Sequence, residues 1–351
     1  MKSKKKTILN IAILVLLFVL TIYLIFKGQD LSPIIENIKH VNKMYLTAGL
    51  ISVIVFVCCE SVIIKYLLAV VKIKWPLYKC IRYSFVGFFF SCITPSATGG
   101  QPAQVYYMHK EGLDIPTSTI ILMLVTIQYK FVLVFIGGLL VVFGQGLIGA
   151  QTTEVQFYLI FGLALNVFCV AFMSFLVFWP NVARFLMVRL YMILYKLHII
   201  KKIYPRLKSL KKSMDSYQAA SNFLRQNKMS FLTVFVISLF QRLLLFYVTY
   251  IVYKCFGLSG HSALEITLLQ GIISISVDML PLPGGMGISE HLFTRIFVPV
   301  FGSTALTLSA MLVSRGISYY GLIIISAIIT IYTHVVTAKY ASNKQLEKRG
   351  E

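Results

Sequence analysis

Three basic residues, Lys130, Arg242 and Arg315, lie within stretches of the chain that are otherwise apolar. A charged side chain at the centre of a bilayer costs about 2.5–3.5 kcal/mol on insertion scales, so it needs either a partner or a function. Two interpretations are open at this point. The cations could pair with carboxylates for structural reasons, or they could face a cavity and attract an anionic group. The candidate carboxylate partners are Glu60, Asp278 and Glu290.

Prolines and a glycine pair interrupt two of the apolar segments. The first interruption covers residues 94–102 and the second covers residues 281–287. Unwound backbone in hydrocarbon costs several kcal/mol for each unpaired polar group, so such breaks survive only where protein or a wet cavity covers them. Matching interruptions in two halves of a membrane protein are typical of a transporter's binding site.

Both interruptions supply groups suited to binding a phosphate or a carboxylate. We expect helical segments to begin after Gly100 and after Gly285, and the free N–H groups of a helix N-terminus favour an anion. Glycine is expected there both for unusual backbone angles and for close approach. Asp278 and Glu290 flank the second break and could bind a cationic group of the same molecule, or a coupling proton. The candidate binding residues are Thr94, Thr98, Gly99, Gly100, Gln101, Gln104, Lys130, Arg242, Asp278, Gly284, Gly285, Ser289, Glu290 and Arg315.

One spacing connects the cations with the breaks. Lys130 lies 30 residues after Gly100 (130−100=30), and Arg315 lies 30 residues after Gly285 (315−285=30). This match predicts a cation at the same position relative to each glycine pair.

The elements that position these residues must be membrane helices. Hydrophobic residues make up 58% of the 351 residues and charged residues only 13%, about half of the charged fraction of a soluble domain. Continuous apolar runs are each long enough to cross a bilayer of roughly 30 Å. They fall at about 7–26, 44–70, 117–143, 156–180, 229–253 and 303–335. We therefore predict an all-α integral membrane protein with about six full spans.

The placement of positive charge predicts the orientation. The net charge is +21, and basic residues gather before the first span, after the second span (Lys72, Lys74, Lys79, Arg82), in 181–228 and at the end of the chain. The loop 144–155 has no Lys or Arg. Because cytoplasmic loops carry the excess of basic residues, both termini and 181–228 are predicted to be cytoplasmic, although Lys27, Lys39 and Lys43 fit poorly. We expect no nucleic-acid partner.

Threading the interrupted segments through this topology makes each one a re-entrant helical hairpin. Residues 83–110 would enter from the cytoplasmic side and residues 264–300 from the outer side. The chain would then contain an inverted-topology repeat, with a first half at 44–143 and a second half at 229–335. We treat residues 1–351 as a single polytopic membrane domain.

The basic segment 181–228 has apolar residues at helical spacing, beginning with Phe185 and Val188. Such an amphipathic helix would lie on the membrane surface and contact anionic lipid head groups. The alternatives are an anchor that only fixes topology, or a docking site for a soluble partner. The six cysteines and six histidines show no metal-ligand spacing, so neither a metal nor another cofactor is expected.

The segments TPSATGGQPAQVYYMHKEG (94–112) and LPLPGGMGISEHLF (280–293) resemble the paired signature segments of the lysylphosphatidylglycerol synthase transmembrane-region family. This family includes the flippase-like membrane part of bacterial multiple-peptide-resistance proteins. The resemblance covers roughly residues 10–335 and adds Pro95, Pro102, Pro283 and Gly287 to the residues at signature positions. It implies a multi-pass protein of the bacterial plasma membrane that moves a charged phospholipid, such as lysyl-phosphatidylglycerol, between leaflets.

The same resemblance leaves an enzymatic alternative open. Full-length synthases carry a large soluble C-terminal domain that transfers lysine from charged tRNA to phosphatidylglycerol, and no counterpart to it precedes Glu351. The rival prediction is a phosphatidylglycerol lysyltransferase, acting alone or with a separate soluble synthase partner. A scaffold for envelope-lipid enzymes is a third alternative, and a homo-oligomer is also open.

Overall fold

The computed structural model describes residues 31–94, 97–196, 214–215, 217–219, 221–222 and 226–347. Throughout these residues the regular structure is helical and no strand occurs, as predicted. The predicted first span at 7–26 lies outside the described residues.

Five helical segments are long and apolar enough to cross a membrane. They are α3 (Lys43–Val70), α6 (Ile115–Phe143), α8 (Thr153–Phe178), α11 (Lys228–Cys255) and Thr304–Thr337. The last of these is made of α14 (Thr304–Arg315), the π-helix η3 (Gly316–Gly321) and the first part of α15 (Leu322–Glu347). These five correspond to five of the six predicted spans.

Polar caps fix where several of these helices begin. The Asn42 side chain accepts a hydrogen bond from the Met44 N–H at the start of α3, and Asp114 accepts one from the Thr117 N–H at the start of α6. Such caps satisfy N–H groups that have no partner inside the helix. The apolar runs therefore become helices with defined first turns.

Each interrupted segment forms two short helices. The first gives α4 (Leu77–Cys92) and α5 (Gly100–Lys110), and the second gives α12 (Ala263–Val277) and α13 (Ile288–Phe301). These helices have 11 to 16 residues, fewer than the roughly 20 that a bilayer span requires. The two members of each pair pack against each other. Entry of the two pairs from opposite faces of the membrane stays a prediction.

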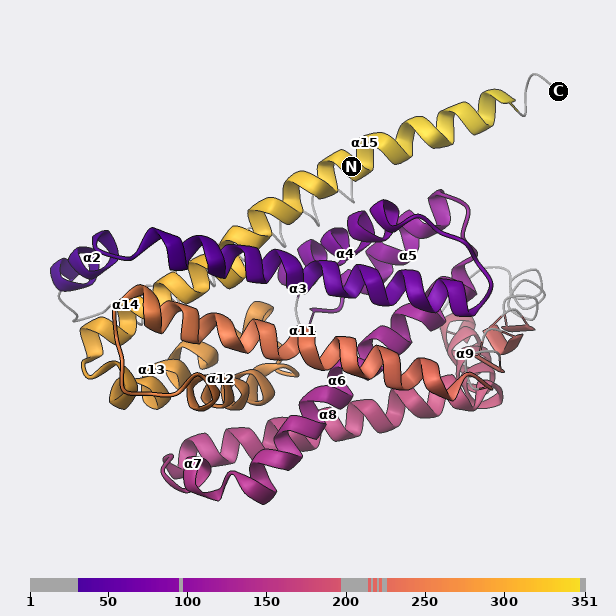
Figure 1. Ribbon diagram of the computed structural model, residues 1–351. Coiled ribbons are helices and arrows are strands. Elements are labelled where there is room, and N and C mark those ends of the chain that lie inside the picture. The colour runs from indigo at the N-terminus through magenta and orange to yellow at the C-terminus, as the bar shows by residue number, and fades with distance from the viewer. Residues whose placement is uncertain are drawn as a thin grey trace.

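The two halves interlock around the long helices α3 and α11, which run side by side through the middle of the molecule (Figure 1). On one side, α6 packs against α8, and α8 also contacts α12. On the other side, α15 from the second half packs against α4 from the first half. Residues of both broken segments line one cavity together with residues of α11 and α14.

The peripheral elements are shorter. α2 (Leu31–Lys39) packs against α14, and α7 (Gln145–Gly149) follows α6. α9 (Pro180–Lys196) forms the start of the predicted basic segment 181–228, and its Phe185 and Leu186 are exposed. Most of the remainder of that segment lies outside the described residues.

Candidate functional site

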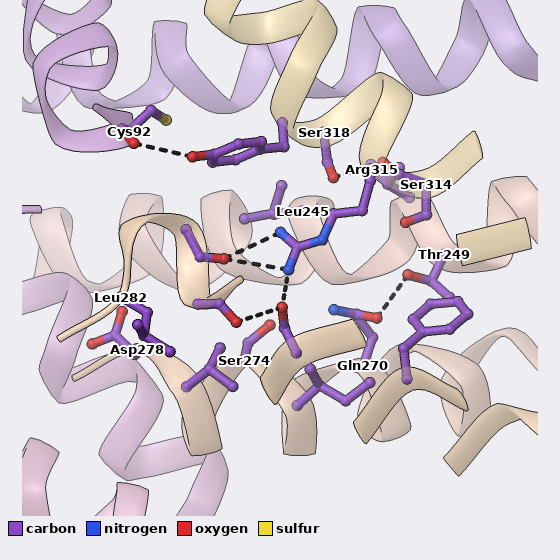
Figure 2. A pocket seen from close by; sticks show the side chains of 18 of the residues that line it. Cys92, Leu245, Thr249, Gln270, Ser274, Asp278, Leu282, Ser314, Arg315 and Ser318 are labelled. Carbon is purple, nitrogen blue, oxygen red and sulfur yellow. Dashed lines mark hydrogen bonds between the residues drawn. The ribbon is translucent and has the colours of Figure 1, made fainter. Parts of the chain in front are cut away.

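A cavity of about 290 Å³ lies between the two broken segments. Its lining comes from the end of α4, the first break, α11, α12, the second break, α13, α14 and η3 (Figure 2). The lining includes six of the residues predicted from sequence to form a binding site. The six are Arg242, Asp278, Gly284, Gly285, Ser289 and Arg315.

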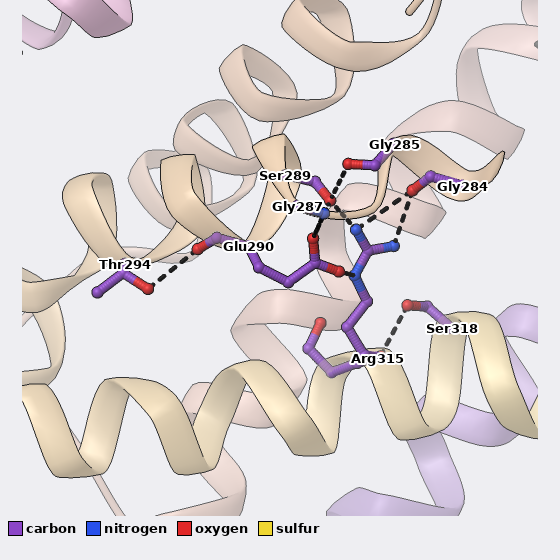
Figure 3. A network of polar contacts seen from close by, with 9 residues as sticks. Gly284, Gly285, Gly287, Ser289, Glu290, Thr294, Arg315 and Ser318 are labelled. Atoms are coloured by element: carbon purple, nitrogen blue, oxygen red, sulfur yellow. Dashed lines mark hydrogen bonds and ion pairs between the residues drawn. The ribbon is translucent and has the colours of Figure 1, made fainter. Parts of the chain in front are cut away.

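Arg315 is the centre of the polar contacts at the second break (Figure 3). Its Nε lies 2.9 Å from Glu290 Oε1, and its two terminal nitrogens donate to the Gly284 carbonyl oxygen at 3.3 Å. One of these nitrogens also donates to the Ser289 hydroxyl. The guanidinium therefore holds the turn and the start of α13 together from α14.

The backbone of the second break depends on glycine. Gly284, Gly285 and Gly287 have φ values of 59°, 66° and 89°, which residues with a side chain rarely adopt. The Gly287 N–H donates to Glu290 Oε2 at 2.7 Å, so the chain's own carboxylate caps α13. The prediction that α13 begins directly after Gly285 was wrong, because the turn continues through Gly287 and the helix starts at Ile288.

Lys130 pairs with a carboxylate from the other half of the chain, whereas Arg315 contacts the break in its own half. The Lys130 Nζ lies 2.6 Å from Asp278 Oδ2 and 2.8 Å from Met279 Sδ, at the end of α12 in the other half. Lys130 is buried, with 5% of its surface exposed. The equal spacing of 30 residues thus leads to an ion pair within the second half for Arg315 and to an ion pair between the halves for Lys130.

Arg242 differs from both of these cations. Its guanidinium lies 4.2 Å from the centre of the Tyr129 ring and 5.3 Å from that of Phe56. Within the described part of the chain, no carboxylate oxygen lies within 4.0 Å of it, and its buried Nε has no hydrogen-bond partner. Arg242 is therefore the cavity cation that is available for an external anion.

The first break is built by close packing. A Cβ at Gly100 would lie 2.1 Å from Ser91 Oγ and 2.7 Å from the Gly87 carbonyl oxygen. Gly99 has an ordinary φ of −82°, so the expectation that unusual angles require glycine at this pair was wrong. The left-handed residue of this turn is Ala97, with a φ of 55°. α5 begins at Gly100 itself, one residue earlier than predicted.

The other residues predicted at the first break are not among those that line the cavity. The Gly99 N–H donates to Thr94 Oγ1 at 2.9 Å, and Gln101 donates to the Thr126 hydroxyl on α6. Gln104 Nε2 donates to Glu60 Oε1 on α3 at 2.7 Å. Thr98 is exposed, and Pro95 lies outside the described residues. The first break instead contributes Ser91, Cys92 and Ala97 to the cavity.

Sequence reasoning missed Tyr319, which connects the two breaks. Its hydroxyl donates to the Cys92 carbonyl oxygen at 3.0 Å, and its ring occupies the space that a Cβ on Gly284 would need. Tyr319 belongs to the π-helix η3, a distortion that is frequent at functional sites. Its position four residues after Arg315, in a polar stretch of an apolar run, is the sequence signal that could have indicated it.

A second missed group holds the base of the first pair of helices together. Glu111 accepts contacts from Arg82 at 2.9 Å, Lys79 at 3.1 Å and the Tyr83 hydroxyl at 2.8 Å. Arg82 and Glu111 are both buried. Lys79 and Arg82, which the charge pattern assigned to membrane orientation, therefore also join α4 to α5.

The geometry suits an anionic ligand held by one free guanidinium and neutral donors. The cavity that Arg242 lines is also lined by Gln270, whose side-chain oxygen accepts from the Thr249 hydroxyl at 3.0 Å, and by Ser274, Ser314 and Ser318. The paired charges at Arg315 and Asp278 hold the walls in place. A small polar head group with a phosphate matches this set of donors.

Comparison with known proteins identifies the family of this chain. A search of the curated proteins finds no match. The family described as Lysylphosphatidylglycerol synthase TM region matches residues 8–326, which includes both broken segments and every cavity residue. This chain is a multi-pass membrane protein that belongs to the lysylphosphatidylglycerol synthase TM region family.

Proposed function

We propose that the protein moves a phosphate-bearing phospholipid between the leaflets of the bacterial plasma membrane, with the cavity as the head-group site. The observation that carries the proposal is the position of Arg242, a membrane-embedded guanidinium that lines a polar cavity without a carboxylate partner in the described residues. Leaving a cation in that state is costly, so a ligand that supplies the counter-charge explains its presence.

The size of the cavity supports a head group and not a whole lipid. Its volume of about 290 Å³ has room for roughly ten water molecules at about 30 Å³ each. A glycerophosphate group fits such a space, whereas two acyl chains do not. The acyl chains would stay in the bilayer while the head group passes through the protein.

The ion pairs at the walls support a preference among head groups. Asp278 lines the cavity and uses Oδ2 for Lys130, which leaves its other oxygen for the amino group of an aminoacylated lipid such as lysyl-phosphatidylglycerol. Glu290 is held by Arg315 and by the start of α13, so its role is to position Arg315. Gly284 and Gly285 bring the backbone to the cavity wall.

The test is lipid movement in vesicles that contain the purified chain and acyl-labelled phosphatidylglycerol or lysyl-phosphatidylglycerol, read as loss of label from one leaflet. Arg242→Gln removes a charge-assisted contact worth about 1.5–3 kcal/mol, so movement should slow roughly tenfold or more. Arg242→Lys keeps the charge but loses the planar fork and should be intermediate. Arg295→Gln on α13 is the matched control, because this guanidinium is 57% exposed. A rate for Arg242→Gln within twofold of the control would remove Arg242 from the site.

The family's description favours a second candidate function, the transfer of lysine to phosphatidylglycerol, alone or with a soluble partner. Extraction of lipids from cells that express the chain separates the two. New lysyl-lipid formed by this chain alone would establish transfer. Altered exposure of lipid in the outer leaflet, at constant lipid composition, favours movement.

A further inference from the structure

The cavity wall that α12 forms changes from charged to neutral along its length. Gln270, Ser274 and Asp278 all line the cavity, and their spacing of four residues places them on one face of α12 and its C-terminal turn. Asp278 pairs with Lys130. Gln270 lies two helical turns from this ion pair, roughly 12 Å along the helix axis. The wall therefore has a charged end and a neutral polar end.

The neighbouring helix α11 shows the same division. Arg242 and Thr249 both line the cavity and lie seven residues, or two turns, apart. The Arg242 guanidinium lies 4.2 Å from the centre of the Tyr129 ring, and the Lys130 Nζ lies 5.0 Å from the centre of the same ring. Thr249 instead contacts Gln270. The two helices thus gather their charges at one end of the cavity and their neutral polar groups at the other.

The neutral end contains a side-chain amide in a fixed orientation. The Thr249 hydroxyl donates to Gln270 Oε1 at 3.0 Å, and Thr249 is buried, with a χ1 angle that β-branching restricts. Because the amide oxygen accepts from Thr249, the amide nitrogen is turned away from that residue (Figure 2). Within the described part of the chain this nitrogen has no hydrogen-bond partner. Its two N–H groups are therefore available to a ligand.

The available groups match a hydroxyl better than a second anion. The Gln270 amide nitrogen donates, and its oxygen keeps a second lone pair. The Ser274 hydroxyl, which also lacks a partner among the described residues, both donates and accepts. A hydroxyl group of a ligand can use all of these groups because it does both as well. Phosphate and ester oxygens only accept.

We propose that Gln270, oriented by Thr249, is a specificity residue that binds hydroxyl groups of the lipid head group while Arg242 binds the phosphate. Both Gln270 and Arg242 line the same cavity of about 290 Å³, so a single glycerophosphate group can contact both. The substrate class is then an anionic phospholipid with hydroxyls beyond its phosphate, such as phosphatidylglycerol. A site that hydrogen-bonds a substrate hydroxyl rejects an analogue that lacks it. This inference rests on the proposed function and adds the group that selects the head group.

The test compares two acyl-labelled lipids in vesicles that contain the full chain. Phosphatidylpropanol has the charge and nearly the size of phosphatidylglycerol but lacks its two free head-group hydroxyls. The wild type is expected to move phosphatidylglycerol roughly fivefold faster or more, since one neutral hydrogen bond changes an equilibrium by about two- to tenfold. Gln270→Leu keeps the approximate volume without the amide and should bring the ratio of the two rates to within about twofold of one. Arg242→Gln should slow both lipids and leave their ratio unchanged.

Variants of Thr249 test the orientation of the amide. Thr249→Val removes the donor at nearly constant shape and should lower the preference for phosphatidylglycerol, because the amide is then free to turn. Thr249→Ser keeps the hydroxyl and should retain the wild-type preference, which separates orientation from packing. Gln145→Leu on α7 is the matched control, because Gln145 is exposed and does not line the cavity. Its ratio of rates should equal that of the wild type.

The outcomes separate this inference from the proposed function. Equal movement of the two lipids by the wild type would overturn the recognition of hydroxyls and leave the proposed function in place. A preference that survives Gln270→Leu would overturn the role of Gln270. The absence of movement of either lipid by the wild type would overturn the proposed function itself. Because the preference is measured on the wild type, the inference is tested even if Gln270→Leu fails to fold.

Discussion

The two pairs of short helices are fastened at opposite ends. The pair α4–α5 is joined at its base by Glu111 with Lys79 and Arg82, whereas its broken tip is a closely packed turn. The pair α12–α13 is joined at its broken tip by Arg315 and Glu290. The same sequence signal, a glycine pair beside prolines, therefore serves tight packing in one half and unusual backbone angles in the other. The tip of α12–α13 contributes more residues to the cavity lining than the tip of α4–α5 does.

The largest expected effects come from breaking each fastening. Glu111→Gln leaves Arg82 buried without a counter-charge, and Arg315→Ala does the same to Glu290. Each should destabilise the fold by about 3–5 kcal/mol. Hydrogen exchange should rise at 77–83 and 107–113 in the first variant, and at 281–290 in the second. Arg295→Ala, with its exposed guanidinium, is the control. Equal exchange at both pairs in either variant would show that they open as one unit.

Replacing a glycine in each break with alanine tests whether one break depends on backbone angles and the other on close packing. The expected losses of stability are smaller than those of the ion-pair variants. Gly287→Ala should cost about 1–3 kcal/mol through its backbone angle alone, because nothing lies within 4 Å of the added Cβ. Gly100→Ala should cost about as much through crowding, and Ser91→Ala in the same chain should recover part of that loss. Thermal unfolding of the purified variants measures both.

Gly138→Ala is the matched control for these variants, because it lies within α6 with open space around it and an ordinary φ. It should be neutral or slightly stabilising. The contrast between the two breaks fails if Gly100→Ala unfolds at the same temperature as the Gly138→Ala control, since the turn at Gly100 would then not be crowded.

The smallest expected effect concerns the link between the two tips. Tyr319→Phe removes the hydrogen bond to the Cys92 carbonyl oxygen and should cost about 0.5–1.5 kcal/mol. Tyr247→Phe, at an exposed tyrosine on α11, is the comparison. Unfolding midpoints in detergent compare the two variants. A loss as large as that of Arg315→Ala would mean that Tyr319 holds the tips together more than the ion pair does.

Much of the fold could be predicted from sequence because it depends on local composition. Apolar length placed five helices, and the prolines and glycines placed both breaks. Asp278 and Glu290 were recognised as candidate partners because carboxylates are rare in apolar runs. Which cation meets which carboxylate depends on how the halves pack, and spacing alone could not indicate that Lys130 reaches Asp278 across the interface.

Two other features could not be predicted from the sequence, for physical reasons. Lys79 and Arg82 lie close to the end of a span, where a charge for orientation and a charge for an ion pair look alike in sequence. The backbone angles at each glycine pair follow from what lies opposite them. Tyr319 faces Gly284, whereas Ser91 and Gly87 face Gly100, and these neighbours come from tertiary packing.

The π-helix η3 fixes the rotational setting of everything that follows it. A π-turn contains more residues than an α-turn, so deleting one residue within Gly316–Gly321 would restore regular winding and turn the rest of α15 by about 100° about its axis. His334 now lies 3.1 Å from the Tyr107 hydroxyl on α5, and such a deletion would swing it away. The extra residue therefore sets the rotation of α15 about its axis, and this rotation determines which face of the last helix packs against the first half of the protein.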